Sequence, residues 1–552
     1  MINNICSRIG IYITILMKKS GLFFFFLLIF FLEQFTPTLH AQTTNSISAI
    51  RVSMQKRLPS DLEKGSWYIA SEIQEWNPAE TAIIVCDLWN QHWCKGASAR
   101  MTEMAPYMNN VISIARNRGV LIVHAPSECM AYYKNKPARK LGQKYKSKKA
   151  TDLISKDKLE SEKDAVWPVD QSDGVYDCSP ECKQGNLWTR QIDLIQISDK
   201  DAISDSGAEI GGLFYQKGIK NVILLGVNNN MSIIGSSFGL RNMLRIGMNV
   251  ALMRDLSDNM YDSKQAPQVN HFSGNSLINE YIETYICPTI VSTDFTDKKQ
   301  FRFKDDTRPV VAFLTGSEYN SNLSIPGFAR ELLLTGGVNC EFAIGSSTKG
   351  NIEGDQDWHN IENLQILEDA DLAVIFVRRR GLEPPKMDLI KAYVKSGKPV
   401  LGIRTASHAF APRFKAGLSK DFIAGIANWS EFDTEILGGN YKGHPSGKLV
   451  TTFSIVPGME SHPLLKGVSL DNYTSSDQTY FNQSLQSDKA QVLLFGSITG
   501  HPSQPVLWTN FTDNNFVIYT SMGAEGDWHN ENFRHLMRNA VSYLLNLNLI
   551  KR

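Results

Sequence analysis

Residues Asn221–Met253 read NVILLGVNNNMSIIGSSFGLRNMLRIGMNVALM, and this stretch decides the fold class of the first half of the chain. It opens with an apolar run over Asn221–Val227 and closes with a second one over Asn249–Met253. Between the two runs, the pattern across Ser236–Arg245 is typical of a helix. A strand, a helix and a second strand in this order predict parallel strands in a sheet that is covered on both faces.

The same alternation extends outward in both directions. In the first half, Thr81–Cys86 (TAIIVC) and Val120–His124 (VLIVH) are further runs typical of buried strands. A second alternating series follows, with strands predicted at Pro309–Thr315, Ala370–Val377 and Pro399–Ile403. We therefore expect an α/β protein with two doubly wound domains, each a mostly parallel sheet with helices on both faces.

Charged stretches mark the boundaries of these series. Residues 293–308 (TDFTDKKQFRFKDDTR) contain few aliphatic side chains and are expected to form a linker. The predicted organisation is a targeting segment at 1–41, a first domain at 42–292 and a second domain at 309–552. Within the first domain, the Lys-rich stretch 134–164 is expected to be a solvated excursion from the fold.

The N-terminus has the pattern of a signal peptide. Lys18 and Lys19 precede an uninterrupted apolar run at Gly21–Leu32, and Ala41 supplies a small residue for cleavage. The run is too short for a comfortable membrane span. We expect cleavage before Gln42 and an exported mature protein, periplasmic or secreted, without a stable membrane span. A retained signal anchor is the alternative.

Composition limits the classes of function. Of the 552 residues, 42% are hydrophobic and 20% are charged, which excludes a largely disordered or collagen-like chain. The 57 basic residues nearly balance the 56 acidic ones, so no basic field indicates a nucleic-acid partner. Eight cysteines are too few for a scaffold built from disulfides. Cys178 and Cys182 are the pair expected to meet as a disulfide, although spacing leaves the connectivity open.

Three motifs of the first half point to one family. They are Ile84–Asn90 (IVCDLWN), Gly226–Met231 (GVNNNM) and Asn249–Asp258 (NVALMRDLSD). In these motifs, residues 80–290 resemble the isochorismatase-like cysteine hydrolases. The resemblance implies hydrolysis of an amide or vinyl ether on a small substrate, with a thiolate nucleophile, an Asp as general base and an orienting Lys.

The resemblance implies a role for three residues of this chain. Asp87 matches the general base, and Ser232 stands where the amidases carry their Cys. Lys200 is the nearest candidate for the Lys. A Ser hydroxyl needs a stronger base than a thiol does, so we expect thiol-type chemistry to be lost or impaired. Ser232 as a working nucleophile and attack by water are the alternatives.

Four motifs of the second half point to another family. They are Gly402–His408 (GIRTASH), Leu437–Pro445 (LGGNYKGHP), Val506–Trp508 (VLW) and Val517–Gly523 (VIYTSMG). In these motifs, residues 308–550 resemble the ThuA-like (trehalose-utilisation) domains. The resemblance implies a fold similar to the class I glutamine amidotransferases.

The turn after the strand at 399–403 carries Arg404 and no Cys, which excludes glutamine hydrolysis through a thioester. Doubly wound sheets bind ligands at the carboxyl ends of their strands, where Arg404 is expected. We therefore expect Arg404, His408, Tyr441, His444 and His529 to bind a small polar ligand, sugar-derived in the simplest case. A buried ion pair for Arg404 and local hydrogen bonds for His444 are the structural alternatives.

The sequence contains no Walker loop or GxGxxG motif and no His pair at metal-ligand spacing on one helix, so no cofactor and no metal is expected. Two hypotheses remain open. One is an exported, two-domain, hydrolase-like protein that acts on or binds small carbohydrate-derived or amide substrates. The other is a non-catalytic sugar-binding protein built from two degenerate enzyme folds. Whether the chain is an enzyme stays open, and a homo-oligomer is one alternative for its assembly.

Overall fold

The computed structural model describes residues 48–172, 178, 180, 182–335, 337–345, 352–447 and 449–551. The predicted targeting segment and its cleavage site lie outside these residues. From Ser48 onward the chain forms one compact unit. In the part of the chain that is described, no helix combines the length and the apolar character that crossing a bilayer requires.

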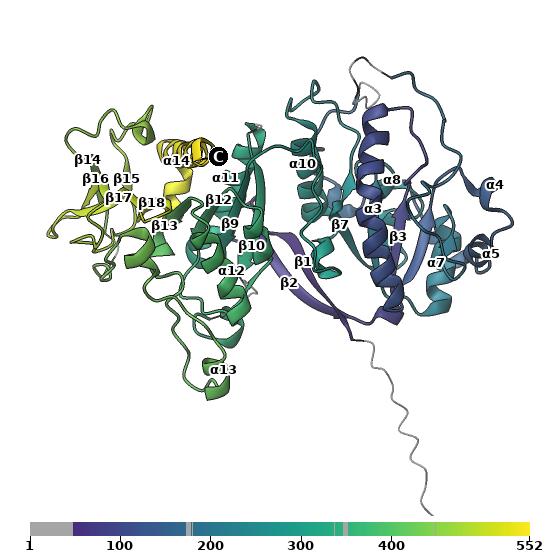
Figure 1. Cartoon of the computed structure of the whole chain (residues 1–552), viewed down its shortest axis with the longest axis horizontal. Coiled ribbons are helices and arrows are strands. Elements are labelled where there is room, and N and C mark those ends of the chain that lie inside the picture. The colour runs from purple at the N-terminus through teal and green to yellow at the C-terminus, as the bar shows by residue number, and fades with distance from the viewer. Residues whose placement is uncertain are drawn as a thin grey trace, which may run out of the picture. The chain divides into compact units, whose positions relative to one another are not determined.

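The first half is built on a mixed sheet with a parallel centre (Figure 1). The six strands from β8 to β5 run parallel, and the hairpin β1–β2 adds two antiparallel strands at one edge. In spatial order the strands are β2 (Trp67–Trp76), β1 (Ile50–Pro59), β8 (Thr289–Ile290), β7 (Asn249–Asp258), β6 (Asn221–Val227), β3 (Thr81–Cys86), β4 (Leu121–Ala125) and β5 (Ala202–Ile203).

Helices cover both faces of this sheet because their apolar side chains recur every three or four residues. On one face, Met101, Met104 and Met108 of α3 (Lys95–Asn117) pack against β3. The other face is covered by α7 (Gly207–Lys217), α9 (Leu240–Arg245) and α10 (His271–Tyr285). Shorter helices are α4 (Met130–Tyr133), α5 (Pro137–Gln143), α6 (Lys148–Leu153) and α8 (Ser232–Gly235).

The Lys-rich stretch 134–164 differs from the solvated excursion that we expected. It contains α5 and α6, and Ala138 and Ala150 of these helices are buried. A Cβ atom on Gly142 would lie 2.1 Å from the backbone oxygen of Ile203, so α5 packs directly on β5. Small residues at the contact, rather than large apolar ones, allow this close approach, and for that reason the stretch reads as polar.

The second half is built on a ten-stranded mixed sheet. Strands β10, β9, β12, β13 and β18 run parallel, and β17, β16, β14 and β15 extend them antiparallel. In spatial order the strands are β11 (Ile361–Glu362), β10 (Asn339–Gly345), β9 (Val310–Thr315), β12 (Leu372–Phe376), β13 (Val400–Ile403), β18 (Phe516–Thr520), β17 (Gln504–Phe511), β16 (Gln491–Ser497), β14 (Thr451–Ile455) and β15 (Thr474–Ser475).

This sheet also has helices on both faces, so the predicted α/β class with two doubly wound sheets is confirmed. Helices α11 (Ser321–Leu334) and α14 (Glu531–Lys551) pack on one face, and α12 (Pro384–Lys395) packs on the other. Helix α13 (Lys420–Ala424) lies in a connecting loop. The antiparallel extension was not expected. Residues 293–308 connect β8 to β9.

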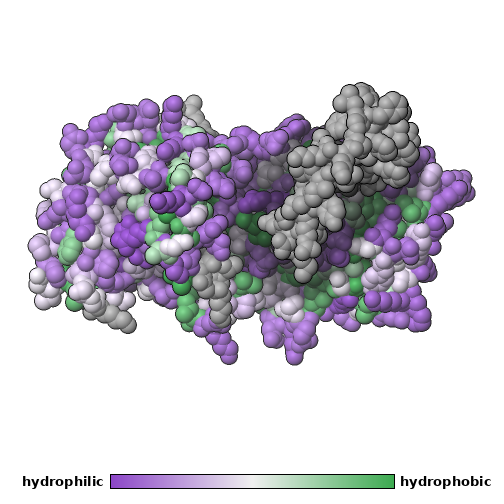
Figure 2. All heavy atoms as spheres, turned by 90° about the horizontal axis from the view of Figure 1, so that it is seen from below, coloured by the Kyte–Doolittle hydropathy of each residue, from purple (hydrophilic) through white to green (hydrophobic). Residues whose placement is uncertain are grey.

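Short turns complete the architecture. The 3-10 turns are η2 (Pro78–Glu80), η3 (Glu160–Glu162), η4 (Ser292–Asp294), η5 (Glu318–Asn320), η6 (Gln356–Trp358), η7 (Leu364–Glu368), η8 (Arg404–His408), η10 (Pro463–Leu465) and η11 (Glu525–His529), and η9 (Asp433–Leu437) is a π-helical turn. Figure 2 shows one face of the molecule, where hydrophilic residues predominate and hydrophobic residues gather in smaller groups.

A buried ion pair lies at the carboxyl end of the second sheet. Arg380 donates to Oε1 of Glu318 at 2.6 Å, and both side chains have 0% exposure. The guanidinium also donates to the carbonyls of Trp358 (2.8 Å) and Asn360 (3.0 Å). A Cβ atom on Gly345 would lie 2.4 Å from the guanidinium carbon, so only glycine leaves room for Arg380 there.

Glu318→Gln would leave the buried charge of Arg380 without its counter-charge. The substitution should therefore lower the free energy of unfolding by roughly 3–5 kcal/mol. Urea denaturation measures this loss. The matched control is Asp152→Asn, which breaks the exposed pair with Lys148 and should cost less than about 0.5 kcal/mol. Equal effects of the two substitutions would contradict the role assigned to the buried pair.

Candidate functional site

Asp87 occupies the carboxyl end of the central strand of the first sheet. It follows β3 directly, has 0% exposure and adopts a φ of 50°. The Ser127 N–H donates to Oδ1 of Asp87 at 2.8 Å, and the Asp87 N–H donates to the carbonyl of Ala125 at 3.2 Å. A buried carboxylate in a sparsely populated backbone conformation is typical of a functional position.

Burial raises the pKa of Asp87 to about 6, although hydrogen bonds from the Ser232 hydroxyl and from Ser127 counteract this effect. The nearby Asp205 charge raises the pKa of Asp87 further. A carboxyl group with a pKa close to the working pH suits general acid–base chemistry. Asp87 therefore has the electrostatic properties of a proton acceptor.

Ser232 is held beside Asp87 by the loop that precedes α8. Asn229 in this loop donates from its side chain to the amide oxygens of Asn275 (2.7 Å) and Asn279 (2.9 Å). Asn230 donates to the carbonyl of Met260 at 2.6 Å. These amide contacts fix the loop that carries the half-buried Ser232, whose hydroxyl is close enough to lower the pKa of Asp87. The structure brings these two predicted site residues together.

Lys200, the third predicted residue of this site, does not lie near Asp87 and Ser232. It is exposed in the turn before β5, whereas Asp87 lies beyond the end of β3. Strands β3, β4 and β5 run parallel, so a residue before one strand and a residue after another lie at opposite edges of the sheet. Ser204 and Asp205 instead follow the carboxyl end of β5. Sequence reasoning did not identify Asp205 as a site residue.

In the second half, Arg404 follows β13 and is buried, with a φ of 44°. Its guanidinium donates to Oδ2 of Asp477 at 2.5 Å and to the carbonyl of Ser521 at 2.9 Å. It also lies over the rings of Tyr319 and Tyr480, at 4.5 and 4.9 Å from their centroids. Arg404 thus forms the buried ion pair that was the structural alternative. Its role in the site is to hold Asp477 and the two tyrosine rings in place.

His408 and Tyr441 are stacked, with ring centroids 4.5 Å apart and planes 19° apart. The Ser407 hydroxyl lies 3.0 Å from Nδ1 of His408. Burial, followed by the charges of Arg379, Arg378, Arg413 and Arg404, lowers the pKa of His408 to about 2. His408 is therefore a neutral hydrogen-bonding group throughout the physiological pH range.

Three further arginines surround this stacked pair, and sequence reasoning missed them. Arg378 and Arg379 follow β12, and Arg413 is exposed in the loop after η8. Arg378 pairs with Glu353 at 2.9 Å. The signal was present in the sequence, since the triplet Arg378-Arg379-Arg380 directly follows a buried strand. This triplet places three positive charges at the carboxyl end of β12.

The glycine-rich loop places Tyr441 against a buried carboxyl group. The Tyr441 N–H donates to Oδ2 of Asp433 at 2.8 Å, and burial raises the pKa of Asp433 to about 6. A Cβ atom on Gly439 would lie 2.2 Å from Oδ1 of Asp433. Glycine is therefore required for the close approach that positions the Tyr441 ring.

The two remaining histidines lie outside this arrangement or at its margin. His444 is exposed, with Nδ1 lying 2.9 Å from the carbonyl of Pro445 and 3.1 Å from the side-chain nitrogen of Gln478. Its ring lies 6.1 Å from that of Tyr480, so it borders the aromatic cluster. His529 is exposed at the end of η11, and within the described residues it makes no hydrogen bond or ring contact with the predicted set.

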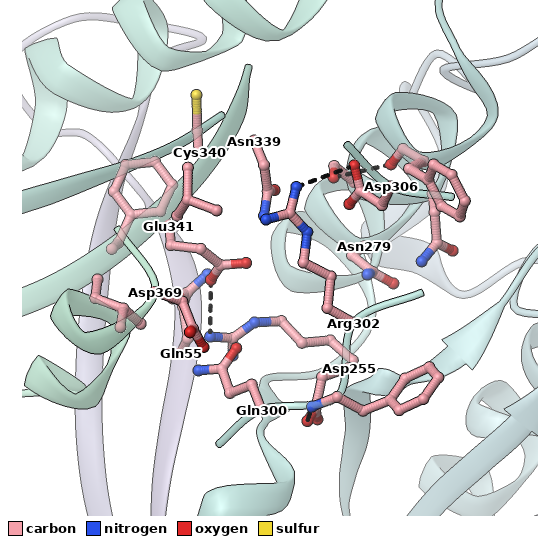
Figure 3. A pocket seen from close by; sticks show the side chains of 18 of the residues that line it. Gln55, Asp255, Asn279, Gln300, Arg302, Asp306, Asn339, Cys340, Glu341 and Asp369 are labelled. Carbon is pink, nitrogen blue, oxygen red and sulfur yellow. Dashed lines mark hydrogen bonds and ion pairs between the residues drawn. The ribbon is translucent and has the colours of Figure 1, made fainter. Parts of the chain in front are cut away.

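No group of three or more metal-ligating side chains with suitable geometry occurs among the described residues. A cavity of about 400 Å³ lies elsewhere and is lined by residues of both halves, but by none of the predicted site residues. Charged side chains of the cavity pair with one another. Arg302 faces Asp306 (Figure 3). Arg254 lies 3.7 Å from Glu341. This internal neutralisation distinguishes the cavity from the arginine-rich site.

Comparisons with known proteins give one matching family model and several similar solved structures. Residues 343–544 match the family model described as ThuA, trehalose utilisation. No curated protein matches the chain. Similar solved structures include a cysteine hydrolase from Pseudomonas syringae pv. phaseolicola, which is 14% identical with a TM-score of 0.26 and 40% of this chain and 91% of that chain covered.

Two further structures are similar. An isochorismatase from Pseudomonas putida is 12% identical with a TM-score of 0.25, and 40% of this chain and 92% of that chain are covered. A ThuA-like protein from Parabacteroides merdae is 15% identical with a TM-score of 0.29, and 43% of this chain and 90% of that chain are covered. Residues 343–544 are thus similar to ThuA domains, as the motifs of the second half predicted.

Proposed function

We propose that this hydrolase-like chain binds a small, anionic, carbohydrate-derived ligand at the carboxyl ends of β12 and β13. The observation that carries the proposal is the stacked pair His408–Tyr441, set among the charges of Arg378, Arg379 and Arg413. Arginine is the side chain best suited to a carboxylate or phosphate, because its planar guanidinium donates two parallel hydrogen bonds.

The other groups of the site suit a polyhydroxylated ligand. A neutral His408 both donates and accepts hydrogen bonds, as sugar hydroxyls require. The Tyr441 ring offers an apolar face with a polar tip. Glu353 and Asp477 balance two of the four arginine charges, which leaves an excess of positive charge to attract an anion. A sugar acid combines the anionic group and the hydroxyls that these side chains would recognise.

A second candidate function belongs to the first half. The specific observation is the buried Asp87, whose pKa of about 6 suits proton transfer during hydrolysis of a small amide-type substrate. With Ser232 in place of a thiol, water activated by Asp87 is the nucleophile in this proposal.

Arg413→Gln should weaken the binding of sugar acids by about tenfold, roughly 1.4 kcal/mol, because it removes one exposed cation from the anion site. Binding of neutral sugars should change much less. Calorimetric titration with uronic, aldonic and neutral sugars measures both effects, and thermal melts should show an unchanged midpoint.

The matched control is Lys395→Gln, which removes an equal charge at an exposed position in the last turn of α12. That turn precedes β13 and therefore lies at the opposite edge of the sheet. If both variants weaken sugar acids equally, general electrostatics explain the effect; if neither does, the arginines form no ligand site.

Asp87→Asn should raise stability at neutral pH. The folded state raises the pKa of Asp87 from 3.8 to about 6, so its contribution is most favourable below pH 4 and is lost as the pH rises through 6. We expect the variant to be more stable by roughly 2–3 kcal/mol at pH 8 and equal near pH 4. Denaturation curves between these pH values measure the difference.

Asp258→Asn supplies the control with opposite sign. Although burial opposes it, Arg100 and His271 hold the pKa of Asp258 well below its usual range, with contacts of 2.7 and 2.8 Å. This substitution should destabilise the protein at pH 8. If Asp87→Asn also loses stability at pH 8, the fold stabilises the Asp87 carboxylate. The pKa of Asp87 would then not be raised, and the argument for Asp87 as a general base near neutral pH would fail.

Ser232→Cys should create a thiol that reacts with iodoacetamide, at a rate that falls when Asp87 is also changed to Asn. The physical reason is that Asp87 accepts the proton of whichever group occupies position 232. Peptide mass spectrometry locates the adduct. Strong amidase activity in the unmodified protein that Ser232→Ala abolishes would contradict water attack and make Ser232 the nucleophile.

A further inference from the structure

A pair of cysteine sulfurs lies at the start of α3. Cys94 immediately precedes the helix and has 0% exposure, and its Sγ lies 3.1 Å from Sγ of Cys178. The two residues are 84 positions apart in the sequence, so only the fold brings them together. A disulfide requires an approach to about 2.05 Å, which small side-chain rotations supply from this distance.

The surroundings of Cys178 favour its thiolate. Its Sγ accepts a hydrogen bond from the Gly96 N–H at 3.4 Å, at the amino end of a 23-residue helix. Burial raises the pKa of the Cys178 thiol, but hydrogen bonds from Cys182, Gly96, Cys94 and Lys95 outweigh it and lower the pKa overall. Amide donors and the helix dipole stabilise a thiolate in such positions.

Other thiols of the chain have the opposite environment. Burial raises the pKa of Cys129 to about 12, and it also raises the pKa of Cys340. These thiols are therefore poor nucleophiles at neutral pH. Cys178, by contrast, is partly exposed and in contact with a second sulfur.

The segment that follows Cys178 in the chain lies against the loop after Asp87. The Trp188 ring stacks on Trp89 at 4.6 Å and on His92 at 5.4 Å. The backbone N–H of Asn90 donates to the carbonyl of Arg190 at 2.9 Å. A covalent link from Cys178 to Cys94 would tie this segment to the loop that follows Asp87.

We propose that Cys178 is a site of thiol–disulfide exchange that ends in a Cys94–Cys178 disulfide. The co-reactant is a small disulfide compound. The Cys178 thiolate attacks one of its sulfurs, which breaks the external S–S bond, releases one thiolate and leaves a mixed disulfide. Cys94 then loses its proton to solvent and attacks the Cys178 sulfur, which releases the second thiolate. Two chain thiols are oxidised to one disulfide, and one external disulfide is reduced to two thiols.

Oxidised glutathione is the probe that tests this proposal on the reduced full chain. Peptide mapping without reductant should identify a Cys94–Cys178 link in the unmodified protein and in the control variants Cys340→Ser and Cys182→Ser. In Cys94→Ser, the reaction should stop at a glutathione adduct on Cys178. Iodoacetamide at pH 7 should label Cys178 in the unmodified protein about tenfold or more faster than Cys340.

Three results would overturn the proposal. One is a Cys178–Cys182 link in the unmodified protein, which is the pairing that sequence spacing favours. The second is a glutathione adduct confined to another cysteine. The third is alkylation of Cys178 that is no faster than that of Cys340. The first and third measurements use the unmodified protein, so they decide the matter even if Cys94→Ser fails to fold.

Discussion

The buried pair between Arg380 and Glu318 is the interaction on which the arrangement of the second half depends. Arg380 points inward, and the same carboxylate accepts the Arg378 N–H at 3.1 Å. The N–H groups of Arg379 and Arg380 donate to the carbonyls of His408 and Ala409. The charge pair fixes the segment after β12, and backbone hydrogen bonds join this segment to the end of η8.

Both halves place their chemical groups at the carboxyl ends of central strands, and both use an unusual backbone there. Asp87 and Arg404 each follow a central strand with a positive φ, of 50° and 44°. A positive φ is unfavourable for a residue with a side chain, so the surrounding structure has to enforce this backbone conformation. In the first half the result is a buried carboxylate kept at a cost in stability, whereas in the second half it is a buried cation held by Asp477 and two tyrosine rings.

The electrostatic character of the two sites is opposite. The first contains Asp87 and Asp205, and the charge of Asp205 adds to the burial that raises the pKa of Asp87. The second contains four arginines, whose charges add to the burial that keeps His408 neutral. The two candidate sites therefore carry charge of opposite sign.

The sequence by itself determined the strands with continuous apolar runs, since such runs are buried on both faces in any parallel sheet. Strands β3 and β6 have the bounds that were predicted. Asp87 and Ser232 were identified from a family resemblance, whereas Arg404, His408 and Tyr441 were identified from their position after such a run or in a glycine-rich loop. The hairpin β1–β2 and strands β16, β14 and β15 were missed, because antiparallel strands with one polar face lack this signal. Strand β17 is buried, but polar residues interrupt its apolar run, and it was missed for that reason.

Only the tertiary structure decided which groups meet. Lys200 fell at the wrong edge of the sheet, because the direction of β5 is set by its pairing with β4 and not by local sequence. The positive charge around His408 comes from loops after different strands, and Cys94 meets Cys178 across 84 residues. Contacts of this kind depend on chain segments that are distant in sequence, and local patterns carry no information about them.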